Sequence, residues 1–504
     1  MTPHPETLAS LALLLAPLLA GGLSLLVRRS AVLHAVNLGG MGLVCAAESV
    51  LAAAVLRDGS LTALNALVYV DALSAVILVI IGFVGLACSL YMRSYMDEQV
   101  ARGVVAPARL NRFFFLFHMF LFAMVLATVA NNLGVQWVAI EATTLATTFL
   151  IAFWRRRESL EAGWKYLILC SVGIALALFG VVLTYYSSLR VLGDVSSALQ
   201  ITQLHRVAAD LDPHILKLAF VFVFVGYGTK VGLAPMHSWL PDAYTEAPAP
   251  VAAMLAGVLE TVAVYAILRT RWIVDVAVSP EFTGALLGLF GLASFALAAF
   301  FLLLQHNYKR LFAYSSIEHM GLAMVGFGVG GPLGTFGGLL HMVNHALAKP
   351  LAFFAAGNIH RRFKTVEVAQ VSGVAAALPW SAAALLVSGV ALAALPPFGL
   401  FVSKLQIVVA LGTDGLPGAG GGLAARASLA LLLACSVVAF AGLLYRITGM
   451  VWGAAPTEVP RGECWSAGHL PFVMLGTALT VFCLVLPAPL QHLLTMATAL
   501  LVVR

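Results

Sequence analysis

Several lysine and glutamate residues lie inside long apolar stretches of the sequence, where a charge is costly. These residues are Glu48, Glu141, Lys165, Lys217, Lys230, Glu260, Lys349 and Lys404. At the bilayer centre each unpaired charge costs on the order of 2.5–3.5 kcal/mol, and the whole set would cost about 20 kcal/mol. A folded protein is stable by only about 5–15 kcal/mol. We therefore expect these groups to pair with one another or to face water.

Such a set is typical of a proton path. Burial lowers the pKa of a lysine and raises that of a glutamate. A buried lysine–glutamate pair can therefore gain or lose a proton when its partner moves. On this basis we pair Glu141 provisionally with Lys230. For any single residue, a static structural ion pair remains the alternative.

Histidines add groups that can relay a proton. His341, His345 and Lys349 recur every fourth position and therefore share one face of a helix. His319 lies in the segment YSSIEHMG. A neutral histidine accepts a proton on one ring nitrogen and donates from the other, which favours a relay over simple hydrogen-bonded bridges between helices. The HxxxH spacing also suits a metal, but no carboxylate or cysteine completes a site, so we predict none. His118 has an apolar setting and is interpreted as a satisfied core histidine.

The elements that must position these residues are membrane helices. The chain has 504 residues, of which 61% are hydrophobic and 10% charged, well below the roughly 25% charged residues of soluble domains. Apolar blocks of about 20 residues, enough to cross a bilayer as a helix, recur along the chain. The first block shows no signal-peptide features and is interpreted as a membrane helix. The predicted helices, about fourteen, are 7–27, 31–56, 71–92, 112–130, 133–153, 164–186, 214–233, 247–268, 282–304, 310–329, 333–357, 376–410, 427–452 and 470–486.

Two of these segments carry signals for a broken helix. Residues 214–233 are glycine-rich and end just before Pro235, and residues 376–410 are too long for one straight span and contain Pro396 and Pro397. Unwound backbone at membrane depth is tolerated only where it is buried in protein or lines a watery cavity. We therefore expect both breaks to lie at a functional site.

The ionisable residues suggest an internal repeat. Lys230 and Lys404 lie near the two breaks, five predicted helices apart, and Glu141 and His319 show the same offset. An odd offset makes two halves inverted copies, as in many transporters, although hydropathy alone can give such offsets by chance. We predict an all-α polytopic fold with inverted repeats in the fourth to eighth and ninth to thirteenth helices. The predicted units are residues 1–111, 112–270, 271–453 and 454–504.

Basic residues indicate the orientation. They concentrate in the loops after odd-numbered helices, whereas loops after even-numbered helices hold fewer, among them Arg269 and Arg271. The richer loops should face the cytoplasm, which places both termini on the outer face of a bacterial or archaeal inner cell membrane. The net charge of +6 is therefore a topology signal, and no nucleic-acid partner is expected.

Cofactor motifs are missing from the sequence. The six cysteines show no CxxC spacing, which argues against an iron–sulfur or zinc site, and no glycine-rich phosphate loop is present. We expect no cofactor and no catalytic residue in this chain. Any redox chemistry would belong to partner subunits.

Four motifs give the chain a family resemblance. It resembles the antiporter-like membrane subunits of respiratory complex I, a family that also supplies multisubunit cation/proton antiporters and membrane-bound nickel–iron hydrogenases. The segment 164–180 and the SSIEHMG motif look closest to the hydrogenase-4 type branch. The motifs are GTKVGLAPMHSWLPDAYTEAPAPVAAMLAGVLETVAVYAILR (228–269), YKRLFAYSSIEHMG (308–321), HMVNHALAKPLAFFAAG (341–357) and PPFGLFVSK (396–404).

The resemblance implies roles for particular residues. Glu141 and Lys230 match the family's glutamate–lysine pair, and Lys404 matches the residue at the outer exit. One departure is Glu260, which stands where many relatives carry a lysine or histidine, so the coupling order of relatives does not transfer directly. The predicted proton path comprises Glu141, Lys165, Lys230, His237, Glu260, His319, His341, His345, Lys349 and Lys404.

The function expected from the resemblance is that of a proton-translocating subunit of a redox-driven respiratory or hydrogenase complex. Its partners would be other membrane subunits, a peripheral redox arm and the lipid bilayer. The alternatives are a subunit of a multisubunit Na⁺/H⁺ antiporter, the membrane subunit of an inorganic-carbon uptake complex, or a structural subunit with a vestigial path. The dominance of lysine and histidine over oxygen ligands argues against sodium.

Overall fold

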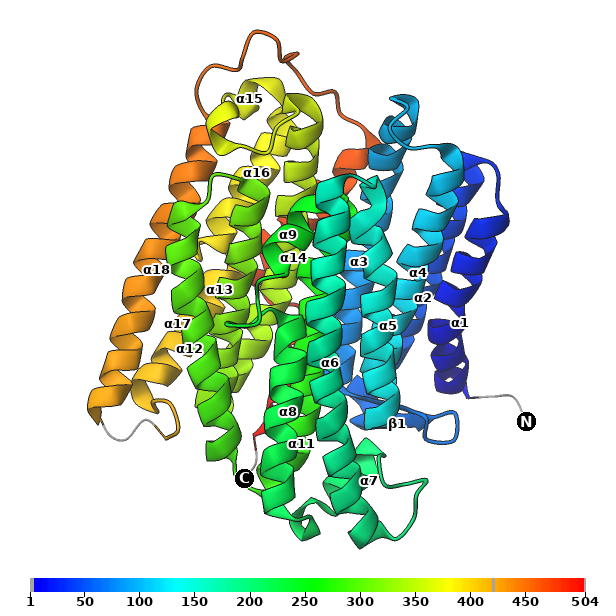
Figure 1. Cartoon of the computed structure of the whole chain (residues 1–504), viewed down its shortest axis with the longest axis vertical. Coiled ribbons are helices and arrows are strands. Elements are labelled where there is room, and N and C mark those ends of the chain that lie inside the picture. Colours follow the sequence, from blue (N-terminus) through cyan, green and yellow to red (C-terminus); the bar gives the residue numbers. More distant parts are fainter. Residues whose placement is uncertain (1–3, 419–421, 503–504) are drawn as a thin grey trace.

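Apolar helices lie side by side along a common direction and form an elongated bundle (Figure 1). The computed structural model describes residues 4–418 and 422–502. Within these ranges, ten helices are long and apolar enough to cross a membrane. The predicted all-α architecture is confirmed apart from one short β-hairpin, whereas the count of about fourteen spans and the inverted repeats stay predictions.

The first four long helices pack against one another at one side of the bundle (Figure 1). They are α1 (Pro5–Leu26), α2 (Ser30–Asp58), α3 (Ala72–Ala101) and α4 (Pro107–Val129). An antiparallel hairpin of β1 (Ser60–Ala63) and β2 (Val68–Asp71), absent from the prediction, joins α2 to α3. The Asp71 side chain then caps α3 by accepting a hydrogen bond from the Ser74 amide at 3.0 Å.

The following helices carry the first half of the predicted path. They are α5 (Leu133–Ile151), η1 (Ala152–Trp154), α6 (Arg157–Leu192), α7 (Ile201–Arg206), η2 (Ala208–Asp210), α8 (Pro213–Val231) and α9 (Leu240–Glu246). Helix α8 ends at Gly232, whose φ of 84° lies in the left-handed region that glycine adopts without strain. The chain turns before α9 begins, so this break lies directly after Lys230.

A continuous helix with one π-helical turn crosses the interior. It consists of α10 (Ala249–Met254), the π turn η3 (Leu255–Leu259) and α11 (Glu260–Ala277). It continues past the predicted end at residue 268, so the placement of Arg269 and Arg271 in a loop was wrong. Both side chains are buried, because Arg269 forms an ion pair with Asp71 and Arg271 with Asp275.

The next three helices include two that are rich in polar residues. They are α12 (Pro280–Leu304), α13 (Tyr308–Val329) and α14 (Gly331–Phe363). Helices α13 and α14 are buried along most of their length and are not among the ten apolar spans. Their polar side chains are therefore shielded from lipid by neighbouring helices.

The second broken helix lies in the last part of the chain. The elements there are η4 (Val368–Gln370), α15 (Val374–Ala377), α16 (Pro379–Leu392), α17 (Gly399–Thr413), α18 (Gly422–Val451), η5 (Ala467–His469), α19 (Leu470–Leu484) and α20 (Ala488–Leu501). The break separates α16 from α17, so Lys404 follows its break whereas Lys230 precedes its own. Helix α20, where the sequence had too little signal, packs against α3 and α14.

The two ends of the described chain lie towards the same end of the bundle. Helix α1 starts, and α20 finishes, towards the lower end in Figure 1. This arrangement agrees with the predicted placement of both termini on one face of the membrane.

Candidate functional site

Lys230 is fully buried and lies in the last turn of α8. Its ammonium group donates to Thr144 Oγ1 at 2.7 Å and to the Tyr166 hydroxyl oxygen at 2.6 Å. Thr144 in turn donates to Glu141 Oε2 at 3.1 Å, and Glu141 Oε1 accepts from Ser171 Oγ at 2.8 Å. The predicted partners Glu141 and Lys230 are therefore linked through one threonine hydroxyl group.

Lys165 and His237 lie apart from this network. Lys165 Nζ is 2.5 Å from a carboxylate oxygen of Asp242 in α9, and Arg310 Nη2 is 3.1 Å from the other oxygen. His237, half-buried in the turn after α8, has its ring centroid 6.4 Å from that of Tyr314. Within the described ranges, neither Lys165 nor His237 is hydrogen-bonded to the Lys230 network.

Glu260 is fully buried at the end of the π turn η3. Its Oε1 accepts a hydrogen bond from the Tyr244 hydroxyl at 2.5 Å, and its Oε2 lies 4.0 Å from His345 Nε2. Gly257 permits this approach, because a Cβ there would lie 3.0 Å from Pro350 Cγ of α14. The π turn thus brings a carboxylate against the histidine face of α14, and such turns are frequent at functional sites.

The histidines of the predicted relay form one cluster. His319 Nδ1 lies 3.0 Å from His341 Nε2, and His341 Nδ1 lies 2.9 Å from Ser403 Oγ. The ring centroid of His345 is 5.4 Å from that of His319. The cluster joins α13, α14 and α17 and approaches Glu260 through His345. In the described part of the chain no group of three His, Cys, Asp or Glu residues is arranged to hold a metal ion.

Two lysines flank the histidine cluster. Lys349 Nζ donates to the backbone carbonyl oxygen of Phe312 at 2.7 Å. Lys404 Nζ lies 3.8 Å from Glu318 Oε1 and 5.2 Å from the ring centroid of Phe295. Glu318 is buried and directly precedes His319, and the structure adds it to the candidate site as the counter-charge of Lys404.

Trp239 separates the Lys230 network from the Glu260 network. Its ring centroid is 4.9 Å from that of Tyr166 and 6.2 Å from that of Tyr244. The indole N–H donates to the carbonyl oxygen of Thr229 at 2.8 Å, and an indole has no acceptor nitrogen. The Trp239 indole therefore cannot accept a hydrogen bond from either network.

Hydroxyl groups were missing from the sequence-based site. Thr144, Tyr166, Tyr244 and Ser403 each bond directly to a predicted path residue. The threonine had a detectable signal, because the ATTLATT segment places threonines at helical spacing within an apolar stretch. The tyrosines had none, since a buried tyrosine is common in any helix core.

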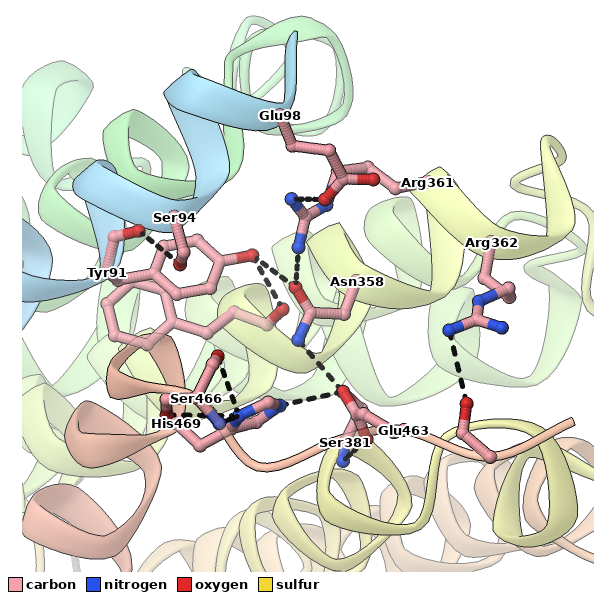
Figure 2. A network of polar contacts seen from close by, with 12 residues as sticks. Tyr91, Ser94, Glu98, Asn358, Arg361, Arg362, Ser381, Glu463, Ser466 and His469 are labelled. Carbon is pink, nitrogen blue, oxygen red and sulfur yellow. Dashed lines mark hydrogen bonds and ion pairs between the residues drawn. The ribbon is translucent and has the colours of Figure 1, made fainter. Parts of the chain in front are cut away.

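A second polar network lies where α14 ends and α19 begins (Figure 2). Glu463 accepts hydrogen bonds from the amide and the hydroxyl of Ser381 at 3.0 and 2.8 Å, and its carboxylate lies 2.9 Å from His469 Nε2. The Ser381 hydroxyl oxygen accepts from Asn358 Nδ2 at 2.9 Å. These bonds tie the segment 454–469 to helices α14 and α16.

Arg361 extends the same network to α3. Arg361 Nη2 and the Tyr91 hydroxyl both donate to Asn358 Oδ1, at 2.5 and 2.9 Å, and Arg361 also forms an ion pair with Glu98 (Figure 2). These side chains line a cavity of about 520 Å³. No residue of this network was predicted, because the sequence does not show which loop segments fold back onto helix ends.

We expect Glu463→Gln to lower the thermal stability of the protein in a pH-dependent manner. Burial alone raises the pKa of Glu463, but hydrogen bonds from His469 and Ser381 outweigh it and hold the pKa below the ordinary 4.5. The charged form therefore stabilises the fold above pH 4.5, and this contribution disappears as the pH falls through the lowered pKa. Each such hydrogen bond contributes about 1.5–3 kcal/mol.

The measurement is the melting temperature of the purified protein at neutral pH and at progressively lower pH. Wild type should melt higher than Glu463→Gln at neutral pH, and the two should converge well below 4.5. The control is Glu367→Gln, at an exposed position, which should match wild type throughout. A difference that does not change with pH would contradict the proposed role of the charge.

The fold and site define an antiporter-like, polytopic membrane subunit. The model of the family described as "NADH:quinone oxidoreductase/Mrp antiporter, TM" matches residues 130–415, which include every predicted path residue. The chain is 39% identical over 417 residues to the hydrogenase-4 component F homolog of Methylacidiphilum infernorum, covering 82% of this chain and 84% of that protein. The chain therefore belongs to the NADH:quinone oxidoreductase/Mrp antiporter membrane-subunit family, and the resemblance to its hydrogenase-4 type branch is confirmed.

Solved structures support the same fold. A chain of the archaeal membrane-bound sulfane sulfur reductase superposes with a TM-score of 0.85 at 23% identity, covering 98% of this chain and 97% of that chain. A chain of the Mrp complex from Dietzia sp. superposes with a TM-score of 0.82 at 21% identity, covering 99% and 97%. The predicted polytopic membrane fold is confirmed.

Proposed function

We propose that this chain carries protons across the membrane as a subunit of a redox-driven complex. The observation that supports this function most strongly is the set of buried ionisable groups on α8, α11, α13 and α14, together with the partly buried Glu141 of α5 and Lys404 of α17. Each is expensive to bury, and intramembrane ionisable residues mark ion pathways in most membrane proteins. Nearly all of them contact a hydroxyl, an imidazole or an opposite charge, which is the local geometry that a proton relay needs.

The path is proposed to consist of two halves, the first joined by hydrogen bonds and the second partly by hydrogen bonds and partly by approaches of about 4 Å, at Glu260–His345 and Glu318–Lys404. The first comprises Glu141, Thr144, Lys230 and Tyr166. The second begins at Tyr244 and Glu260, continues through the histidine cluster and ends at Glu318 and Lys404, with Lys349 beside it. Trp239 lies between the halves, so the halves are insulated from each other until water enters or the indole moves.

We propose that Lys165 and His237 exchange protons between water and the path and are not part of the Lys230 network. Lys165 remains 40% exposed in its ion pair with Asp242, and His237 lies in the turn that interrupts the first broken helix. Both residues are placed to exchange protons with water and not with Lys230 directly.

Glu260 places a negative charge where many relatives carry a positively charged lysine or a histidine. A carboxylate at this position attracts a charged Lys349 or a protonated His345, whereas a lysine or histidine would repel them. Negative charge on Glu260 should therefore draw a proton into the second half of the path. Protonation of Glu260 would release that attraction and let the proton move on towards Lys404.

We propose that electron transfer in partner subunits supplies the energy for proton translocation. The relative in Methylacidiphilum infernorum is a hydrogenase-4 component homolog, and a similar fold occurs in an archaeal respiratory complex. We propose the same setting here: other membrane subunits, a peripheral redox arm, and an inner cell membrane with both termini on the outer face. Residues 1–111, 112–270, 271–453 and 454–504 are proposed as its structural units.

The experiment that tests this function uses the complex as isolated through a tag on this chain. After reconstitution into vesicles, electron donor should produce a pH gradient that a protonophore collapses and that does not require sodium. A gradient that depends on sodium would favour the antiporter alternative. Electron transfer without any gradient would contradict proton translocation.

A further inference from the structure

A second set of buried polar groups lies in helices α2 to α4, outside the residues that match the family model. These groups have no hydrogen-bond partner within the described chain, and each costs about 1–3 kcal/mol if left unsatisfied. They are His34 Nδ1, both amide atoms of Asn37, Glu48 Oε1, Ser89 Oγ and both ring nitrogens of His118. The predicted satisfied core histidine, His118, is therefore buried without a hydrogen bond.

The groups on α2 form a row. His34, Asn37, Met41, Cys45 and Glu48 recur every three or four residues and therefore share one helix face. Between His34 and Glu48 the helix rises by roughly 21 Å, at about 1.5 Å per residue. This distance is most of the roughly 30 Å hydrocarbon core of a bilayer.

Helix α3 runs antiparallel to α2 and contacts the residues at both ends of the row. At one end His34 Nε2 lies 2.8 Å from Asp97 Oδ1. At the other end the Glu48 carboxylate lies against Gly82, and Ser89 lies on α3 between these two contacts. Helix α3 thus packs along the row from Glu48 to His34.

The Asp97 end of the row is in contact with water. The Asp97 side chain is 47% exposed, whereas His34 is only 4% exposed. Asp97 Oδ1 also accepts a hydrogen bond from Ser30 Oγ at 2.9 Å. The row therefore starts at an exposed carboxylate and passes directly to a buried imidazole.

Glu48 occupies a niche at the inner end. A Cβ on Gly82 would lie 1.8 Å from Glu48 Oε2, so a larger residue there would displace the carboxylate from its present position. Cys45, whose Sγ donates to the Gly82 carbonyl oxygen at 3.4 Å, is the titratable neighbour on the same helix. Within the described ranges no Lys, Arg or His from α1, α3, α4 or α20 forms an ion pair with Glu48. A carboxyl group in such surroundings carries a proton in preference to a charge.

His118 of α4 stands beside the middle of the row. Its Cε1 would lie 3.3 Å from a Cβ on Gly40 of α2, and its Cβ would lie 3.2 Å from one on Gly21 of α1. Its imidazole thus faces α2 within the stretch bounded by His34 and Glu48. A neutral imidazole can both accept and donate a proton.

We propose that Glu48 is a proton-binding site that exchanges its proton with the Asp97 end of the bundle, along His34, Asn37, Ser89 and His118. This site goes beyond the proposed function, because it shares no residue with the central path. It binds and releases a proton as the pH on the Asp97 side changes, whether or not the central path is active.

The test uses membrane vesicles that contain the assembled complex and the hydrophobic probe dicyclohexylcarbodiimide, which modifies protonated carboxyl groups in apolar surroundings. Mass spectrometry quantifies the modified peptide that contains Glu48. A drop in pH on the Asp97 face should give rapid labelling of Glu48, and the same drop on the opposite face should not. In Asp97→Asn and His34→Gln, labelling after the same interval should fall at least tenfold.

The matched control is Asp58→Asn, at the other end of α2, where the Asp58 side chain is 51% exposed. It should label as wild type does. Equal labelling from both faces, unchanged labelling in Asp97→Asn and His34→Gln, or no labelling at any pH would overturn the proposal. Glu48→Gln should lose the label but retain donor-driven proton uptake, which separates this site from the central path.

Discussion

Lys230→Ala should reduce donor-driven proton uptake by about a hundredfold or more, the scale on which removal of a proton-transfer group acts. Lys230 is the cation that connects Thr144 and Tyr166 to Glu141 in the first half of the path. Alanine leaves those hydroxyl groups without the donor that orients them and leaves Glu141 without a nearby positive charge. The measurement is the initial rate of uptake in vesicles that contain the assembled complex.

Lys217→Ala is the matched control for this variant. Lys217 lies on the same helix, α8, but its side chain is exposed, with Nζ 5.8 Å from the ring centroid of Phe282. It should keep full uptake. If Lys230→Ala assembles normally and also keeps full uptake, the relay assignment of Lys230 is wrong.

Glu260→Gln should uncouple proton uptake from electron transfer. Glutamine has the size of glutamate and can still accept the hydrogen bond from Tyr244, but it cannot bind a proton or attract positive charge towards His345 and Lys349. The ratio of protons taken up to electrons transferred should fall by about a hundredfold, the lower end of the effects of proton-transfer groups. Parallel measurement of electron transfer and uptake in the same vesicles gives this ratio.

Glu281→Gln serves as the control for that variant. Glu281 lies in the first turn of α12 at an exposed position, so its neutralisation should leave the ratio unchanged. A normal ratio in Glu260→Gln would mean that the carboxyl group of Glu260 only supports Tyr244 and moves no proton.

The charged members of the candidate site could be predicted because a charge inside an apolar segment stands out. The spacing of His341 and His345 indicated a shared helix face, and in the structure His319 of the neighbouring helix α13, also predicted, lies against it. The mediating hydroxyl groups could not be ranked in the same way, since threonine and tyrosine are inexpensive to bury once hydrogen-bonded. The separation of Lys165 from Lys230 depends on Asp242, a partner that sequence spacing does not reveal.

Helix ends were predicted less well than helix centres. Apolarity marks where the chain is inside the membrane, whereas backbone hydrogen bonding continues into water. Helix α3 therefore extends to Ala101, beyond the predicted end at residue 92. The burial of Arg269 depends on Asp71, which is almost 200 positions away in the sequence, and no local pattern contains that pairing.

At the two helix breaks, the lysines lie near opposite ends of a helix dipole: Lys230 near the C-terminus of α8 and Lys404 near the N-terminus of α17. Lys230 lies in the last turn of α8, where unpaired carbonyl groups concentrate partial negative charge. Lys404 lies shortly after the first residue of α17, and helical side chains lean towards the N-terminus, where amide groups concentrate partial positive charge. The backbone therefore attracts a cation at the first break and disfavours one at the second, where Glu318 is the acidic side chain that pairs with Lys404 among the described residues. Similar lysines at two similar breaks thus experience local fields of opposite sign, and we expect this asymmetry to give the proposed path a direction.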